Sequence, residues 1–161
     1  MPFERITTCL WFQDQAEEAA NYYVTTFAPY SKINTAQRNT QPGQETERVM
    51  AVEFELQGRT FVALNGGAVP WQFNEAISMV VNCKDQAEVD YYWEKLSKNG
   101  DASRQQCGWL ADKYGVSWQI VPTAFKEMMC SGDKAGVGRL TAAMMKMKKF
   151  DIAELEKAFK G

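Results

Sequence analysis

The sequence contains no histidine in its 161 residues. Histidine is the most frequent general base near neutral pH and a very common ligand of zinc and iron. Its absence excludes a Ser-His or Cys-His catalytic pair and any histidine-based metal centre. The four cysteines lie far apart, without a C-x-x-C pair: Cys9, Cys83, Cys107 and Cys130. This spacing indicates reduced thiols in a cytoplasmic protein and not a metal or redox site.

The sequence also lacks a charge imbalance and a long apolar run. Its net charge is −2, from 18 basic and 20 acidic residues. A surface that neutralises phosphates is therefore not indicated, and nucleic acid is not an expected partner. The apolar runs have the length of strands, well below the ~20 residues of a membrane span. The N-terminal residues show no apolar run before a small-residue cleavage site, so we expect neither a membrane partner nor a secretory route.

Hydrophobic periodicity in the first part of the chain predicts one helix among four strands. The strands are expected over residues 6–12, 32–38, 49–56 and 60–64, with a polar loop at 41–47 and a tight turn at 57–58. Asp14 and Glu17 have the spacing of a capping box. Apolar residues at 16, 19, 20, 23 and 27 then share one helix face, and Pro29 ends the helix.

The same order of elements follows in the second part. A strand is expected over residues 77–82, and Asp85 with Glu88 forms another capping box. The next helix has an apolar face at 89, 92, 93 and 96, and short strands are expected near 102–106, 109–110 and 116–121. Beyond Pro122 the pattern is helical, with a last helix opened by Asp151. Its clustered methionines suit core or subunit packing, or an adaptable binding surface.

The two parts indicate an internal repeat. Residues 14–17 and 85–88 are both Asp-Gln-Ala-Glu, although two capping boxes could share these letters by coincidence. The repeated order strand-helix-strand-strand-strand is the stronger sign. We therefore predict an α+β fold, one domain over 1–161, with modules at about 4–67 and 76–122 and a helical tail at 123–161.

Four segments resemble a known family. They are Ala63-Leu-Asn-Gly-Gly67, residues 73–78, Cys107-Gly-Trp109 and residues 112–122. Together they resemble the PhnB-like branch of the glyoxalase/bleomycin-resistance (vicinal-oxygen-chelate) superfamily, of the 3-demethylubiquinone-9 3-methyltransferase type. The resemblance runs over nearly the whole chain, including the methionine-rich tail. It implies two β-α-β-β-β modules with curved mixed sheets around a cavity, and a homodimer.

The resemblance also assigns positions that hold a metal in other members of the superfamily. These positions fall on Thr7, Ala63, Ser78 and Gln119, on the first and last strand of each module. Alanine cannot coordinate a cation, hydroxyls are poor neutral ligands, and a lone glutamine is weak. We therefore expect no metal and no other cofactor.

Alternation along the strands predicts which side chains line the cavity. The lining is apolar and aromatic with a few hydroxyls and amides, which is typical of a small-molecule pocket. Several of these side chains could instead fill a core. The predicted ligand-binding residues are Thr7, Cys9, Trp11, Phe61, Ala63, Asn65, Phe73, Ser78, Val80, Trp109, Ser117 and Gln119.

The sequence leaves three functions open. The first is a metal-independent protein that binds a small aromatic or oxygenated molecule. The second is a metal-free isomerase, lyase or transferase, with Glu75 as a base, although Glu75 could also be a solvated loop residue. Cys9 has no histidine to activate it as a nucleophile. The third is the methyltransferase activity of the family name, which lacks the glycine-rich strand-to-helix turn common in proteins that bind S-adenosylmethionine.

Overall fold

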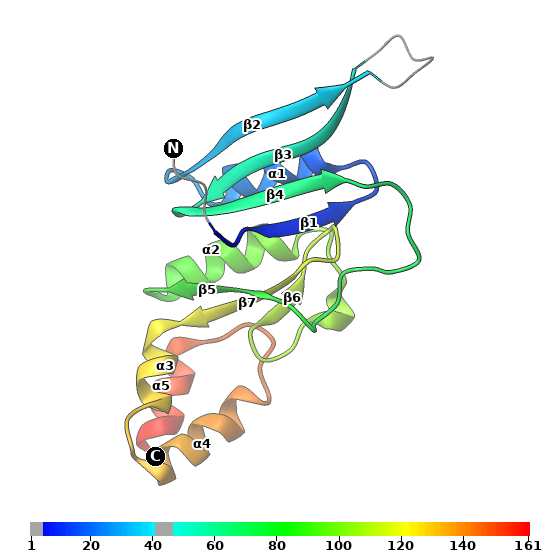
Figure 1. Ribbon diagram of the computed structural model, residues 1–161. Helices are drawn as coiled ribbons and strands as arrows, with labels where there is room; N and C mark the ends of the chain where they lie inside the picture. The colour runs from blue at the N-terminus through cyan, green and yellow to red at the C-terminus, as the bar shows by residue number, and fades with distance from the viewer. Residues whose placement is uncertain (1–4, 41–46) are drawn as a thin grey trace. The chain divides into compact units, whose positions relative to one another are not determined.

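The computed structural model describes residues 5–40 and 47–161, so most of the predicted loop at 41–47 lies outside the described residues. The chain has an α+β fold and divides into two compact units, Met1–Trp71 and Gln72–Gly161. Each unit contains one mixed, open sheet with two edge strands (Figure 1). The elements are β1 (Thr8–Phe12), α1 (Ala16–Thr26), β2 (Ser31–Asn39), β3 (Arg48–Leu56), β4 (Arg59–Asn65), β5 (Met79–Cys83), α2 (Gln86–Ser97), the 3-10 helix η1 (Ala102–Arg104), β6 (Trp109–Ala111), β7 (Ser117–Pro122), α3 (Thr123–Met129), α4 (Lys134–Met144) and α5 (Ile152–Lys160).

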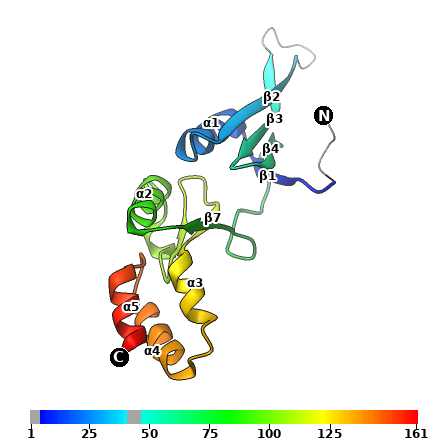
Figure 2. The ribbon, with the colours of Figure 1, turned by 90° about the vertical axis from the view of Figure 1, so that its left-hand side faces the viewer.

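The first unit is a four-stranded sheet with the strand order β1-β4-β3-β2. β1 pairs with β4 in parallel, and the other neighbours are antiparallel. Figure 2 shows α1 along one face of this sheet. The predicted turn at Gln57 and Gly58 is confirmed, with φ values of 49° and 81°. Both angles lie in the left-handed region that a two-residue hairpin turn requires.

The predicted apolar face of α1 forms the core of this unit. All five of its residues are buried, from Ala16 to Phe27. Tyr23 stacks on Phe54 of β3 at 6.1 Å between ring centroids, and Phe54 stacks on Phe61 of β4 at 5.5 Å. This aromatic row fixes which faces of β3 and β4 point toward the helix.

The predicted capping box at the start of α1 is wrong. The N-cap residue is Gln15, and no side chain caps it in the expected way. Instead, Asn65 Oδ1 accepts a hydrogen bond of 2.8 Å from the backbone N–H of Ala16. An oxygen from β4, far away in the sequence, thus satisfies a free amide at the helix start.

The second unit has a three-stranded sheet with the order β5-β7-β6. Here the predicted capping box is confirmed, because Asp85 accepts a bond of 2.9 Å from the Glu88 amide at the start of α2. α2 packs on one face of this sheet. The predicted strand at 102–106 is wrong, since η1 occupies most of it and only Gln106 forms an isolated bridge. Asp101 and its short helical turn replace the fourth strand of the expected module.

Asp112 is buried at 2% exposure in the turn between β6 and β7. Its carboxylate accepts bonds from the backbone amides of Tyr114 and Val116, at 2.9 and 3.0 Å. It also accepts a bond of 2.9 Å from the indole nitrogen of Trp118. This carboxylate therefore organises the turn from beneath, inside the core.

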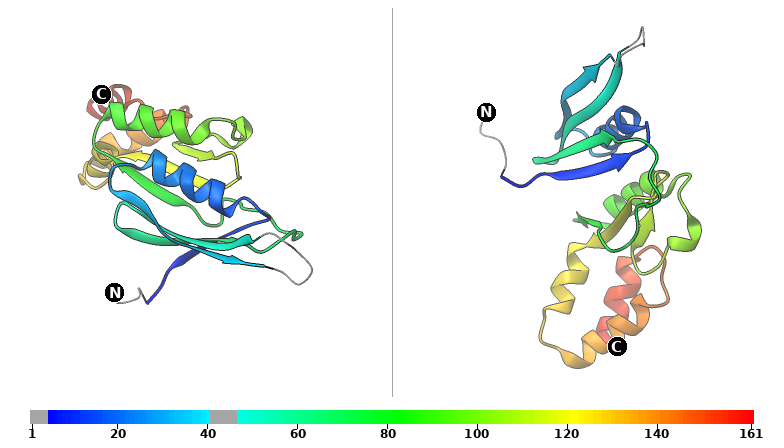
Figure 3. Two further views of the ribbon diagram at one scale, coloured as in Figure 1. Left: turned by 90° about the horizontal axis from the view of Figure 1, so that it is seen from above. Right: turned by 45° about the vertical axis from the view of Figure 1, so that its right-hand side comes forward.

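The C-terminal helices α3, α4 and α5 lie together beyond the end of β7 (Figure 3). Val121, Leu140, Phe150 and Leu155 form their buried core, and partly buried methionines such as Met147 pack against it. Core packing therefore accounts for some of the clustered methionines. Within residues 5–40 and 47–161, no helix has both the length and the apolar character of a membrane span.

Candidate functional site

The candidate site of the second unit is the face of the β5-β7-β6 sheet opposite to α2. Gln119 is the register partner of Val80 on β5 and of Trp109 on β6, so these three side chains form a row across all three strands. Gln119 Nε2 also donates a hydrogen bond of 2.9 Å to Ser78 Oγ, just before β5. Val80 is 44% exposed, although it is a large apolar residue within a strand. We call this row, with Ser78, the open face.

Arg104 borders the open face and was missed by the sequence analysis. Its Nη2 donates to Ser117 Oγ at 2.9 Å, and its Nη1 donates to the Gly115 carbonyl at 3.2 Å. Its Nε donates to the carboxylate of Glu75, with which it forms an ion pair. Phe73, which is half-buried, lies beside Gly115. Arg104 thus connects the loop before β5 to the beginning of β7.

The contact with Arg104 decides what Glu75 can do. The hydrogen bond from Arg104 is the main cause that lowers the pKa of the Glu75 carboxyl below its usual value. The side chain is exposed in the loop before β5. A carboxylate with a lowered pKa is a weaker base, so this geometry does not favour Glu75 as a general base. It favours a structural partner of Arg104.

In the first unit, the face opposite to α1 carries Cys9 and Trp11. Both are exposed, whereas the alternate residues Leu10 and Phe12 are buried toward α1. Thr7 lies just before β1 and is also exposed. Three predicted residues do not share this face: Phe61, Ala63 and Asn65.

The predicted direction of these three side chains is wrong. Phe61 and Ala63 are buried, and Phe61 stacks on Phe54 beneath α1. Asn65 contacts the first turn of α1 through its amide oxygen. The parallel register pairs Cys9 with Val62 and Trp11 with Leu64, so Val62 and Leu64 lie on the face opposite to α1.

Trp11 is held at the edge of this face. Its Nε1 donates to the Gly67 carbonyl at 3.0 Å, and its ring meets Trp71 edge-on at 5.9 Å. A Cβ at Gly66 would lie 2.2 Å from the Trp11 ring, so a glycine is required there. Cys9, expected to be a buried thiol, is exposed on this face. Partial desolvation raises its pKa, which keeps it a weakly reactive thiol.

The positions that hold metal in other superfamily members were tested against the donors present. Ser78 and Gln119 are hydrogen-bonded to each other, Thr7 offers one hydroxyl, and Ala63 points toward α1. Its neighbours Val62 and Leu64 have no donor atom. Across the part of the chain that the structure describes, no three carboxylates or thiols cluster as a metal site would require. These residues do not fit a divalent metal ion.

Comparison with known proteins identifies the family. The family model described as 3-demethylubiquinone-9 3-methyltransferase matches residues 4–121. The match ends before α3, so the helical tail, which was included in the sequence resemblance, lies outside it. No curated protein matches the chain.

Solved structures agree with this match. A putative 3-demethylubiquinone-9 3-methyltransferase, PhnB protein, from Bacillus cereus is 33% identical over 74% of this chain and 100% of its own, with a TM-score of 0.66. Protein PA1353 from Pseudomonas aeruginosa is 16% identical over 74% of this chain and 98% of its own, with a TM-score of 0.58. A lactoylglutathione lyase from Agrobacterium tumefaciens is 17% identical over 76% of this chain and 95% of its own, with a TM-score of 0.44. The chain therefore belongs to the 3-demethylubiquinone-9 3-methyltransferase-like (PhnB) family of the glyoxalase/bleomycin-resistance superfamily.

Proposed function

We propose that this protein binds a small aromatic or oxygenated molecule on the open face of its second unit, without a metal ion. The observation that carries the proposal is the row of Val80, Gln119 and Trp109, which combines an exposed apolar surface with an amide. Small-molecule sites typically combine apolar walls with a few polar groups that fix the orientation of the ligand.

The chemistry of each side chain suggests its part in binding. Trp109 and Val80 would contact a flat, apolar ring, because aromatic side chains stack well on such rings. Gln119 presents an amide that already donates to Ser78, so its oxygen is available to accept from a ligand hydroxyl. A ligand with one ring and one or two oxygen atoms would match this set.

An enzymatic role has less support. The ion pair with Arg104 lowers the basicity of Glu75, and the raised pKa of Cys9 weakens the thiol as a nucleophile. Neither sheet is the doubly wound parallel sheet in which S-adenosylmethionine commonly binds. We therefore treat the methyltransferase description as the name of the family and not as the activity of this chain.

We further propose that the protein is a cytoplasmic homodimer. β1 and β5 are edge strands of their own sheets, and unpaired strand edges favour pairing with another chain. The four cysteines form no disulfide, as expected in a reducing compartment. Light scattering during gel filtration would measure the mass in solution, and a mass near 18.3 kDa would contradict the dimer.

A binding screen on metal-analysed protein tests the main proposal. We expect no stoichiometric zinc, nickel, manganese or iron in the purified protein, and stabilisation by some members of a panel of phenols and quinones. Gln119→Leu should remove at least tenfold of the affinity for a hit, as expected when a hydrogen bond to the ligand is lost. Gln37→Leu makes the same change on exposed β2 and should leave affinity unchanged.

Two results would refute the proposal. A stoichiometric metal would contradict metal independence and would point to donors outside the assigned positions. Equal effects of the two glutamine variants on every hit would show that the ligand does not occupy the open face.

A further inference from the structure

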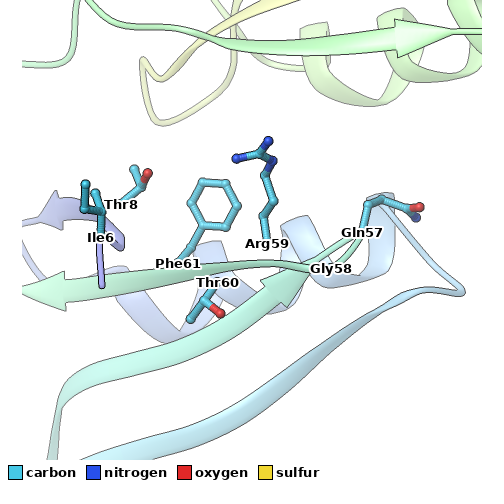
Figure 4. A pocket seen from close by; sticks show the side chains of 7 residues that line it. All are labelled: Ile6, Thr8, Gln57, Gly58, Arg59, Thr60 and Phe61. Atoms are coloured by element: carbon cyan, nitrogen blue, oxygen red, sulfur yellow. The ribbon is translucent and has the colours of Figure 1, made fainter. Parts of the chain in front are cut away.

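A separate pocket lies at one corner of the first unit's sheet (Figure 4). It has a volume of about 400 Å³ and is lined by Ile6, Thr8, Gln57, Gly58, Arg59, Thr60 and Phe61. We propose that this pocket binds the carboxylate group of a small aromatic acid. It lies on the α1 side of the sheet, so it is distinct from the open face and does not depend on the function proposed for that face.

The strand register builds the pocket from four side chains. β1 and β4 are parallel, and Thr8 is the register partner of Phe61. Ile6 and Arg59 each precede one of these residues by two positions, so alternation directs all four to the same side. Figure 4 shows Ile6, Thr8, Arg59 and Phe61 on that side, whereas Thr60 points away from it.

The position of α1 explains why this corner stays open. α1 packs mainly over β3, and its contacts with β2 and β4 are fewer. The end of α1 is tied to the β3–β4 turn, because Gln57 Nε2 donates 2.7 Å to the Phe27 carbonyl. Phe61 stacks on Phe54 and is buried, so it gives the pocket a fixed aromatic wall. Ile6, at 88% exposure, forms the opposite apolar side.

The polar groups of the pocket suit an anion. Arg59 is exposed and makes no ion pair or side-chain hydrogen bond with any residue in 5–40 or 47–161. A guanidinium group binds a carboxylate through two parallel hydrogen bonds. The Thr8 hydroxyl can donate a further bond from the neighbouring strand. No carboxylate lines the pocket, so nothing in its lining competes for Arg59.

Size and polarity narrow the ligand to a small aromatic acid. A volume of about 400 Å³ is at the small end of the usual range for ligand pockets, so a single ring with a carboxylate would fit. The carboxylate would face Arg59 and Thr8, and the ring would lie between Ile6 and Phe61. A free inorganic anion would use only the first half of this arrangement.

Titration of the protein with benzoate, followed by two-dimensional amide NMR, tests the assignment. We expect saturable shifts at Thr8, Arg59 and Phe61. Arg59→Gln should weaken benzoate binding about tenfold, whereas Arg48→Gln removes an exposed arginine from β3 and should leave it unchanged. Unchanged amide spectra away from the pocket, and equal thermal unfolding, would confirm that both variants keep the fold.

Two further comparisons test the apolar half of the pocket. Ile6→Asn changes a residue that is almost fully exposed, so the fold should tolerate it. We expect it to weaken benzoate binding about threefold and to leave acetate binding unchanged. The proposal would be overturned by equal losses in the two arginine variants, by shifts confined to other residues, or by inorganic phosphate binding more tightly than benzoate.

Discussion

Removing the Asp112 carboxylate should destabilise the protein more than any comparable change to an exposed aspartate. Three donors point at this buried group: the amides of Tyr114 and Val116 and the indole of Trp118. A hydrogen bond to a charged group contributes about 1.5–3 kcal/mol, and a buried donor without an acceptor is costly. Asp112→Ala would strand all three donors, so we expect a loss of about 3–5 kcal/mol in the free energy of unfolding.

The isosteric variant gives the sharper test. Asp112→Asn replaces one oxygen with an NH₂ group, which must then face either Trp118 or the two backbone amides. We expect a loss of about 2–3 kcal/mol, which corresponds to a fall of about 4–12 °C in melting temperature for a domain of this size. Asp101→Asn, at the exposed cap of η1, should cost less than about 1 kcal/mol because asparagine is also a good cap.

A double-mutant cycle locates the effect. Trp118→Phe removes the indole donor, and in the Asp112→Asn background this loss should partly compensate. Urea unfolding followed by circular dichroism measures all four proteins, and we expect a coupling of about 1–2 kcal/mol. Additive effects, or an Asp112→Asn variant as stable as Asp101→Asn, would refute the view that this carboxylate organises the turn.

Two further predictions concern Arg104 and the glycines. The Arg104 bond lowers the pKa of Glu75, so its stabilising contribution is present above the unfolded pKa and is lost as the pH falls through the folded one; carbon-13 NMR should give a midpoint below 4.5, and Arg104→Gln should raise it. An unchanged midpoint in that variant would contradict this cause. Gly100→Ala would place a Cβ 2.1 Å from the Ala111 carbonyl oxygen and should destabilise by about 1–3 kcal/mol, whereas Gly138→Ala, in open space within α4, should stabilise by up to about 1 kcal/mol; denaturant unfolding of both variants checks this contrast.

Local patterns in the sequence predicted most of the secondary structure. Strands and helices have strong periodicities, and the buried face of α1 agrees with the spacing of its apolar residues. The two identical tetrapeptides show the limit of such patterns. Asp85 caps α2, but α1 begins one residue later than its copy predicts and takes its first hydrogen bond from Asn65. That bond depends on the packing of β4 against the helix, which a local pattern does not contain.

Charged loop residues were the hardest to foresee. Arg104 lies in a stretch that was expected to be a strand, and its partners Glu75 and Ser117 are 29 and 13 positions away. Asp112 was expected only to form a turn, yet it is buried beneath one. In both cases the signal is a contact between distant segments, so composition and spacing alone could not find it.

The facing of β4 has a consequence for where a ligand can bind. A strand alternates with a period of two, so an error of one position moves every side chain to the other face. The sequence analysis directed Phe61 and Ala63 toward the ligand, whereas the register with β1 directs Val62 and Leu64 away from α1. The conclusion about metal survives this correction, because neither pair has a donor atom. The conclusion about the ligand changes, since the face opposite to α1 is more aliphatic than predicted and its main aromatic surface is Trp11 with Trp71.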